Sequence, residues 1–100
     1  MASAPEDPTL CAMRETDVKF HVRNIVRDGE VGFTKHARME MAEDDMSVAD
    51  CMNLLRAGIV GAAEWENGEY RYRITTPRMC IVISFQSPTR LTIVTAWRVQ

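Results

Sequence analysis

Two arginines, Arg71 and Arg73, lie two residues apart in a stretch that alternates polar and apolar residues. In an extended strand such side chains point to the same side, about 7 Å apart, which suits a phosphate group. Guanidinium groups stay charged at every relevant pH and bind phosphate oxygens through paired hydrogen bonds. The two arginines are therefore candidates for stabilising a phosphoryl transition state. The alternative interpretation is a solvated strand face.

His36 lies near the start of a predicted helix, where the positive end of the helix dipole favours a neutral imidazole. A neutral imidazole can accept a proton, so His36 is a candidate general base. The alternative is a half-buried histidine bonded to a backbone carbonyl. His21 lies on the polar side of the preceding helix and is a weaker candidate. Trp65 and Trp97 could stack on a base, although packing in a core or an interface is the commoner role.

These side chains have to be positioned by the surrounding elements, and the first half of the chain has helical periodicity. The spacing of apolar residues predicts helices from Asp17 to Gly29, from Thr34 to about Asp44 and from Ser47 to Gly58. Ser47 and Asp50 fit a capping box at the start of the third helix. Residues 31–33 are expected to form a short link.

The second half has the periodicity of strands. Asn67-Gly68 predicts a hairpin, because a type I′ turn needs positive φ at both of its central residues. One strand precedes this turn over residues 59–65, and three follow it over residues 70–75, 80–85 and 91–98.

The expected fold is therefore α+β, with three N-terminal helices packed on one face of a C-terminal four-stranded antiparallel meander. Neither the helices nor the sheet could bury an apolar face without the other. Residues 16–100 are predicted to form a single domain, and residues 1–15, with two prolines, a flexible N-terminal tail. The sheet face that carries Arg71 and Arg73 is then free of helices.

Composition narrows the class of function. Residues 1–50 carry a net charge of −5 and residues 51–100 one of +3, and the overall pI of 5.6 argues against indiscriminate coating of nucleic acid. The chain has no apolar run of membrane-spanning length and no secretory signal, and its three cysteines do not suggest a disulfide framework. We therefore expect a cytoplasmic protein without membrane contact. Two histidines and no Cys-x-x-Cys predict no metal site.

Several short motifs resemble a known family. The stretch from Phe33 to Arg38, then Met46-Ser47 and the helix ending at Gly58, resembles small bacterial proteins that contain domain of unknown function four-two-five-eight. That family is similar to the RelE and MqsR toxins and is often encoded beside antitoxins. Residues 68–75 and 81–85 resemble the C-terminal strands of MqsR.

This resemblance covers about eighty residues. At three places the family and MqsR commonly carry basic residues, where this chain has Glu40, Asp44-Asp45 and Gln86.

The resemblance implies a RelE/MqsR-like toxin of a type II toxin–antitoxin pair, a metal-independent and cofactor-free endoribonuclease that cuts single-stranded RNA. Its partner is expected to be a protein antitoxin, itself a small DNA-binding protein. The implied catalytic residues are Arg71, Arg73, His36 and Tyr72, and the implied RNA-binding residues are Lys35, Arg38, Tyr70 and Arg78. The alternative function is a non-catalytic protein-binding module of the same fold.

Overall fold

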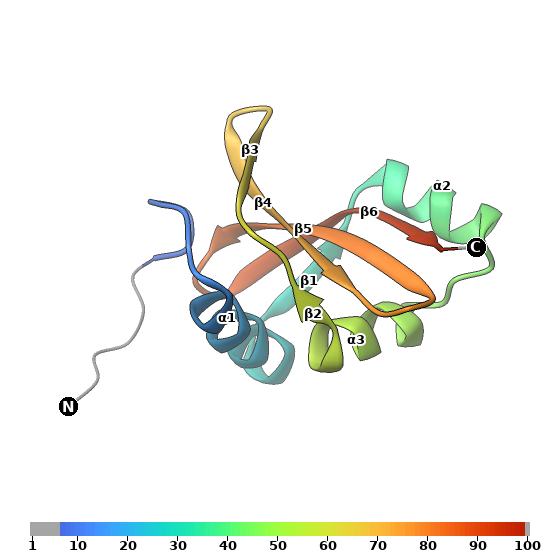
Figure 1. Ribbon diagram of the computed structural model, residues 1–100, viewed down its shortest axis with the longest axis horizontal. Coiled ribbons are helices and arrows are strands. Elements are labelled where there is room, and N and C mark those ends of the chain that lie inside the picture. The colour runs from blue at the N-terminus through green and yellow to red at the C-terminus, as the bar shows by residue number, and fades with distance from the viewer. Residues whose placement is uncertain (1–6, 100) are drawn as a thin grey trace.

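The computed structural model describes residues 7–99. These residues form an α+β fold with three helices and one mixed sheet (Figure 1). The elements in chain order are α1 (Glu15–Asp28), β1 (Glu30–Phe33), α2 (Lys35–Glu43), α3 (Val48–Ala57), β2 (Ile59–Val60), β3 (Glu64–Glu66), β4 (Glu69–Thr75), β5 (Met79–Ser87) and β6 (Arg90–Arg98).

The predicted four-stranded antiparallel meander is wrong, because the sheet has six strands and mixes parallel with antiparallel pairing. Its order is β1-β6-β5-β4-β2, and β3 also pairs with β4. The predicted link at residues 31–33 lies within β1, which pairs in parallel with β6 from Glu30 opposite Arg90 to Phe33 opposite Ile93. The predicted strand over residues 59–65 is in fact two short strands, β2 and β3, which pair with different parts of β4.

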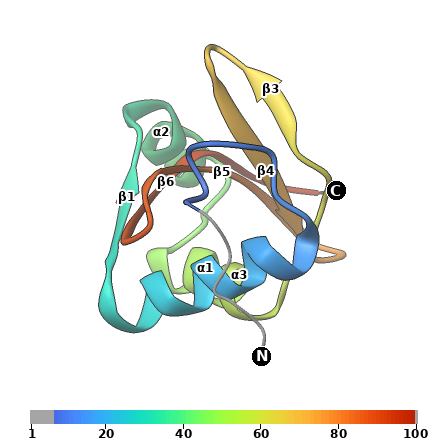
Figure 2. The same ribbon diagram turned by 90° about the vertical axis from the view of Figure 1, so that its left-hand side faces the viewer.

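The positions of the helices also correct the expectation that all three pack on one face. Helices α1 and α3 contact each other and lie side by side on one face of the sheet (Figures 1 and 2). Helix α2 lies apart from them, alongside β6. We call the face packed on α1 and α3 the inner face and the opposite one the outer face.

Helix α2 takes the place that a strand would occupy beside the distal half of β6. The backbone N–H of Ala96 donates to the Glu40 carboxylate at 3.3 Å, and that of Arg98 donates to the Asp44 carboxylate at 2.9 Å. The Arg98 guanidinium also donates to the carbonyls of Asp44 and Asp45. The carboxylates of Glu40 and Asp44 thus satisfy two backbone N–H groups on an otherwise open sheet edge.

Local signals explain the helix starts and the hairpin. Thr34 caps α2 by accepting from the Ala37 N–H at 3.0 Å. Ser47 and the carboxylate of the third helical residue form both bonds of the predicted capping box. Asn67 and Gly68 have φ values of 51° and 79°, which confirms the predicted hairpin.

The core lies between the inner face and the two helices. Most of its fully buried members come from α1, α3 and the three long strands, among them Val18, Cys51, Leu54, Tyr72, Ile81, Ile83, Leu91 and Ile93, and α2 adds Ala37. Met13 belongs to the same core, and its N–H donates to the Tyr72 hydroxyl at 2.9 Å. Pro8 is also fully buried. Two residues of the predicted flexible tail over residues 1–15, Pro8 and Met13, are therefore packed on the domain, while residues 1–6 lie outside the described residues.

Among the described residues, no helix has the length and apolar character needed to cross a membrane.

Candidate functional site

Arg71 and Arg73 lie on the outer face, as their alternation with Tyr72 and Ile74 predicts. Their charges are already matched by acidic neighbours. The Arg71 guanidinium lies 3.0 Å from the Glu69 carboxylate and 3.6 Å from that of Glu66, and its side chain is only 15% exposed.

Arg73 is more open but is also engaged. Its Nε donates to the Glu64 carboxylate at 3.1 Å, and its guanidinium carbon lies 6.0 Å from the centroid of the Trp97 ring. The antiparallel register of β3 on β4 brings these glutamates beside the arginines. The two guanidinium groups therefore share three carboxylates, and an anion that binds them has to displace carboxylate contacts.

His36 lies at the margin of the same face. Its Nε2 is 3.2 Å from Glu40 Oε1, and that carboxylate also accepts from the Thr95 hydroxyl. Thr95 pairs with Val82, which pairs with Arg73, so Thr95 and Arg73 share the outer face across two strand spacings of about 4.8 Å each. Among residues 7–99 His36 contacts neither arginine through a hydrogen bond or an ion pair.

The two tyrosines lie on the inner side of β4, away from the arginines. Tyr72 is 0% exposed, and its burial raises the pKa of the phenol although the Met13 N–H bond opposes that effect. Tyr72 is therefore a core residue, which corrects its predicted catalytic role. Tyr70 is half-buried and packs edge-on against Trp65, with 4.8 Å between the ring centroids.

The remaining predicted RNA-binding residues do not converge on the arginines. Lys35 is exposed in the first turn of α2, and Arg38 stacks over the Phe33 ring at 5.3 Å. Arg78 lies in the turn between β4 and β5. The Gln86 side chain donates to the Ser84 hydroxyl at 3.0 Å and accepts from the Thr92 hydroxyl.

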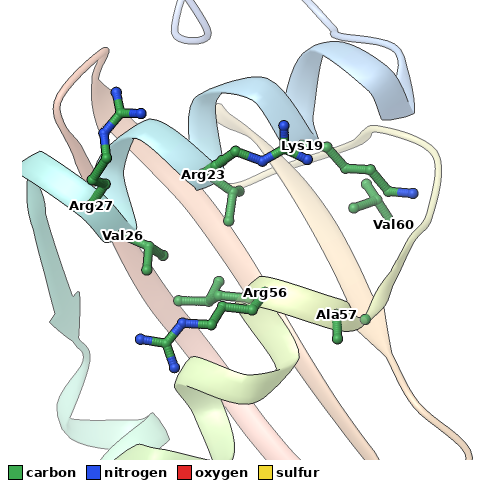
Figure 3. Close-up of a pocket in the computed structure, with 10 residues that line it drawn as sticks. Lys19, Arg23, Val26, Arg27, Arg56, Ala57 and Val60 are labelled. Carbon is green, nitrogen blue, oxygen red and sulfur yellow. The ribbon is translucent and has the colours of Figure 1, made fainter.

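A second surface was not identified from the sequence: a groove between α1 and α3 that encloses about 560 Å³ (Figure 3). We call it the α1–α3 groove. Its floor is aliphatic, and its walls carry cations from both helices. The apolar residues lining it are Val22, Val26, Leu55, Ala57 and Val60, and the basic ones are Lys19, Arg23, Arg27 and Arg56.

The groove cations differ from the outer-face arginines in their partners. Arg27 donates to Asp28 at 2.8 Å and to Asn24 at 3.2 Å, and its side chain turns away from the groove in Figure 3. Within residues 7–99, Lys19, Arg23 and Arg56 form no ion pair, and no acidic residue lines the groove. This region therefore has uncompensated positive charge in a chain of net charge −2.

One signal in the sequence could have indicated part of this groove. Lys19, Arg23 and Arg27 recur every four residues, which places them on one helix face. Arg56 and the aliphatic floor required the packing of α3 on α1, which no local pattern encodes.

The described residues contain no group of three or more histidine, cysteine, aspartate or glutamate side chains that could hold a metal ion. No protein-family model, curated protein or solved structure matches this chain.

Proposed function

We propose that this chain is a protein-binding module that holds an acidic partner protein in the α1–α3 groove. The observation that carries the proposal is the combination of an aliphatic floor with the unpaired cations Lys19, Arg23 and Arg56. Apolar area supplies binding energy, and the surrounding charges favour an acidic partner and speed its association.

The outer face supports this function less well. Arg71 and Arg73 already contact three glutamates, and a protein that binds them has to compete with those contacts. The exposed cations of the groove carry no such cost.

The resemblance adds a candidate identity for the partner. Under it, the acidic protein is an antitoxin, a small DNA-binding protein encoded nearby, and both proteins act in the cytoplasm. The proposed identity of the partner and the cytoplasmic location rest on the resemblance of the motifs around His36 and Gly68.

The test uses two labelled peptides of equal length, one of glutamate and leucine and one of lysine and leucine. We expect the purified protein to bind only the acidic peptide, with affinity that falls as salt is added. The double variant Arg23→Glu/Arg56→Glu should bind at least about tenfold more weakly, since each reversal replaces an attraction by a repulsion. The matched control is Arg78→Glu, which reverses a charge in an exposed turn that does not line the groove.

Binding of both peptides alike, or an equal loss in Arg78→Glu, would show that the groove is not the contact site. No binding of the acidic peptide would contradict the function itself. The assay is fluorescence anisotropy, with far-UV circular dichroism of each variant to confirm that it folds.

A second candidate function is the metal-independent endoribonuclease that the resemblance implies. One observation favours it: Arg73 with Trp97, and His36 with Glu40 and Thr95, share the outer face. In that function the arginines stabilise the phosphorane while an imidazole takes the 2′-hydroxyl proton.

The endoribonuclease candidate makes a separate set of expectations. Arg73→Ala, Arg71→Ala or His36→Ala should slow cleavage of single-stranded RNA, whereas Glu64→Gln should tighten RNA binding because it releases Arg73 from its carboxylate. Intact RNA after incubation with the unaltered protein, and normal growth on expression of the chain by itself, would rule this candidate out.

A further inference from the structure

We infer that the α1–α3 groove accepts one amphipathic α-helix of the partner, with acidic residues on both sides of an apolar stripe. This inference rests on the proposed protein-binding function and names the form of the ligand. Three features support it: the aliphatic floor, the positions of the cations, and the lack, within the described part of the chain, of aromatic and hydrogen-bond-accepting side chains in the lining.

The aliphatic floor of the groove can pack against a helix. Val22 and Val26 lie one turn apart on α1, and Leu55 of α3 and Val60 of β2 line the same groove. Two packed helices leave a furrow between them, and a third helix can lay its own apolar ridge into it. A partner helix that does so completes a layer of three helices on the inner side of the sheet.

The cations set the charge pattern of that helix. Lys19 and Arg23 are four residues apart on α1, which at 1.5 Å per residue is about 6 Å, whereas Arg27 is engaged by Asp28 and Asn24. Two acidic residues at the same four-residue spacing on a helix beside α1 can face Lys19 and Arg23. Arg56 lies across the floor on α3, so the other flank of the partner helix needs a carboxylate as well.

The groove lacks the groups that a nucleic acid needs. Among residues 7–99, no aromatic side chain lines the groove, whereas recognition of single-stranded RNA depends on bases stacked on rings. The lining also offers no side-chain acceptor for base donors, since its polar side chains are cations only. An aliphatic floor beneath a sugar–phosphate chain would stay in contact with water, but beneath a leucine stripe it is buried.

The experiment compares two acidic peptides of identical composition and about 14 residues, which is long enough for three to four turns. In one, leucines recur at helical spacing with glutamates on both flanks, and in the other the same residues are scrambled. We expect the ordered peptide to bind at least about tenfold more tightly and to gain helical circular dichroism on binding. The chemical-shift changes that the ordered peptide causes in the backbone amides of the ¹⁵N-labelled protein should concentrate at residues 19–27 and 55–60.

The variants locate the contact. Arg23→Glu/Arg56→Glu, and the milder Arg23→Gln/Arg56→Gln, should each weaken the ordered peptide, the reversal more than the neutralisation. Arg78→Glu should change the affinity by less than about twofold. Fluorescence anisotropy measures all four proteins, and thermal melts show whether each variant is folded.

Each contrary result has a distinct meaning. Equal affinity for the scrambled peptide would refute the helical ligand while leaving the protein-binding function intact, and no affinity for either peptide would refute both. Displacement of the ordered peptide by a single-stranded RNA that itself requires Arg23 and Arg56 would make the groove a nucleic-acid site. A dimer seen by light scattering and abolished by the double reversal would make a second copy of the chain the occupant, and would also overturn the inference.

Discussion

Replacement of Glu40 by alanine should destabilise the fold far more than is usual for a surface glutamate. Its carboxylate accepts from the Thr95 hydroxyl and from the Ala96 N–H, and lies 3.2 Å from the His36 imidazole. Strand β1 ends at Phe33, opposite Ile93, so within residues 7–99 no strand pairs with Ala96 on that side of β6.

The magnitude follows from the two lost hydrogen bonds. A hydrogen bond to a charged group contributes about 1.5–3 kcal/mol, and the 26% exposure of the Glu40 side chain puts each bond at the lower end. Water can reach part of the vacated space and replace some of the lost interaction. We therefore expect Glu40→Ala to lower the free energy of unfolding by about 2–3 kcal/mol, and Glu40→Gln, which keeps an acceptor, by about 1 kcal/mol.

The matched control is Glu43→Ala, on the same helix but exposed and without a hydrogen bond or ion pair among residues 7–99. Because both changes are Glu to Ala in α2, the difference in helix propensity largely cancels. Glu43→Ala should stay within about 0.5 kcal/mol of the unaltered protein.

Urea unfolding followed by circular dichroism measures both variants. With a slope of about 1–3 kcal/mol per molar urea, a loss of about 2–3 kcal/mol should lower the Glu40→Ala midpoint by roughly 0.7–3 M. Thr95→Val, which removes only the hydroxyl bond, should produce a smaller fall. If Glu40→Ala and Glu43→Ala unfold at the same midpoint, the carboxylate does not shield the β6 edge and the reasoning is wrong.

Three further predictions concern the core. A chain that starts at Glu15 lacks the Met13 side chain and its bond to Tyr72, so its thermal midpoint should fall by roughly 10 °C or more, and an unchanged melt would show that residues 7–14 are dispensable. Leu55→Ala, at a buried position, should cost about 2–3 kcal/mol in urea unfolding, and a negligible change would contradict the packing of α3. Burial raises the pKa of the Cys51 thiol from 9.0 to about 11. The stability that the buried, protonated thiol contributes should therefore be complete below pH 9 and be lost as the pH rises towards 11. Cys51→Ala should flatten this part of the curve of unfolding free energy against pH.

Local patterns were sufficient for the elements whose partners are near in sequence. The capping box at Ser47, the hairpin at Asn67-Gly68 and the alternation of Arg71 with Tyr72 each depend on a few neighbouring residues. The structure confirms all three for that reason.

Contacts between distant parts of the chain were missed. Strand β1 is four residues long, and its pairing is with a strand 60 positions away, so nothing near Gly32 signals it. Met13 lies 59 positions from Tyr72, and without a periodic stripe around it the segment was interpreted as a tail.

The candidate site shows the same division. The sequence indicates which face of β4 carries Arg71 and Arg73, but not that glutamates of β3 and β4 neutralise them. The sequence marked Glu40 only as an acidic residue where the resembled family commonly carries a basic one, whereas its hydrogen bond to the Ala96 N–H makes it part of the edge of β6. Whether a charge is available to a ligand depends on tertiary contacts, which a single sequence does not reveal.

The order of the strands determines when each element can fold during synthesis on the ribosome. Strand β6 is the shared neighbour of β1, β5 and α2, and it spans residues 90–98. Until those residues have left the exit tunnel, β1 has no partner and α2 no surface, so the N-terminal half of the nascent chain exposes apolar side chains such as Ile25 and Met41. At about 5–20 residues per second, synthesis from the end of α2 at Glu43 to the end of β6 at Arg98 takes several seconds. During that time chaperones can bind the exposed apolar side chains.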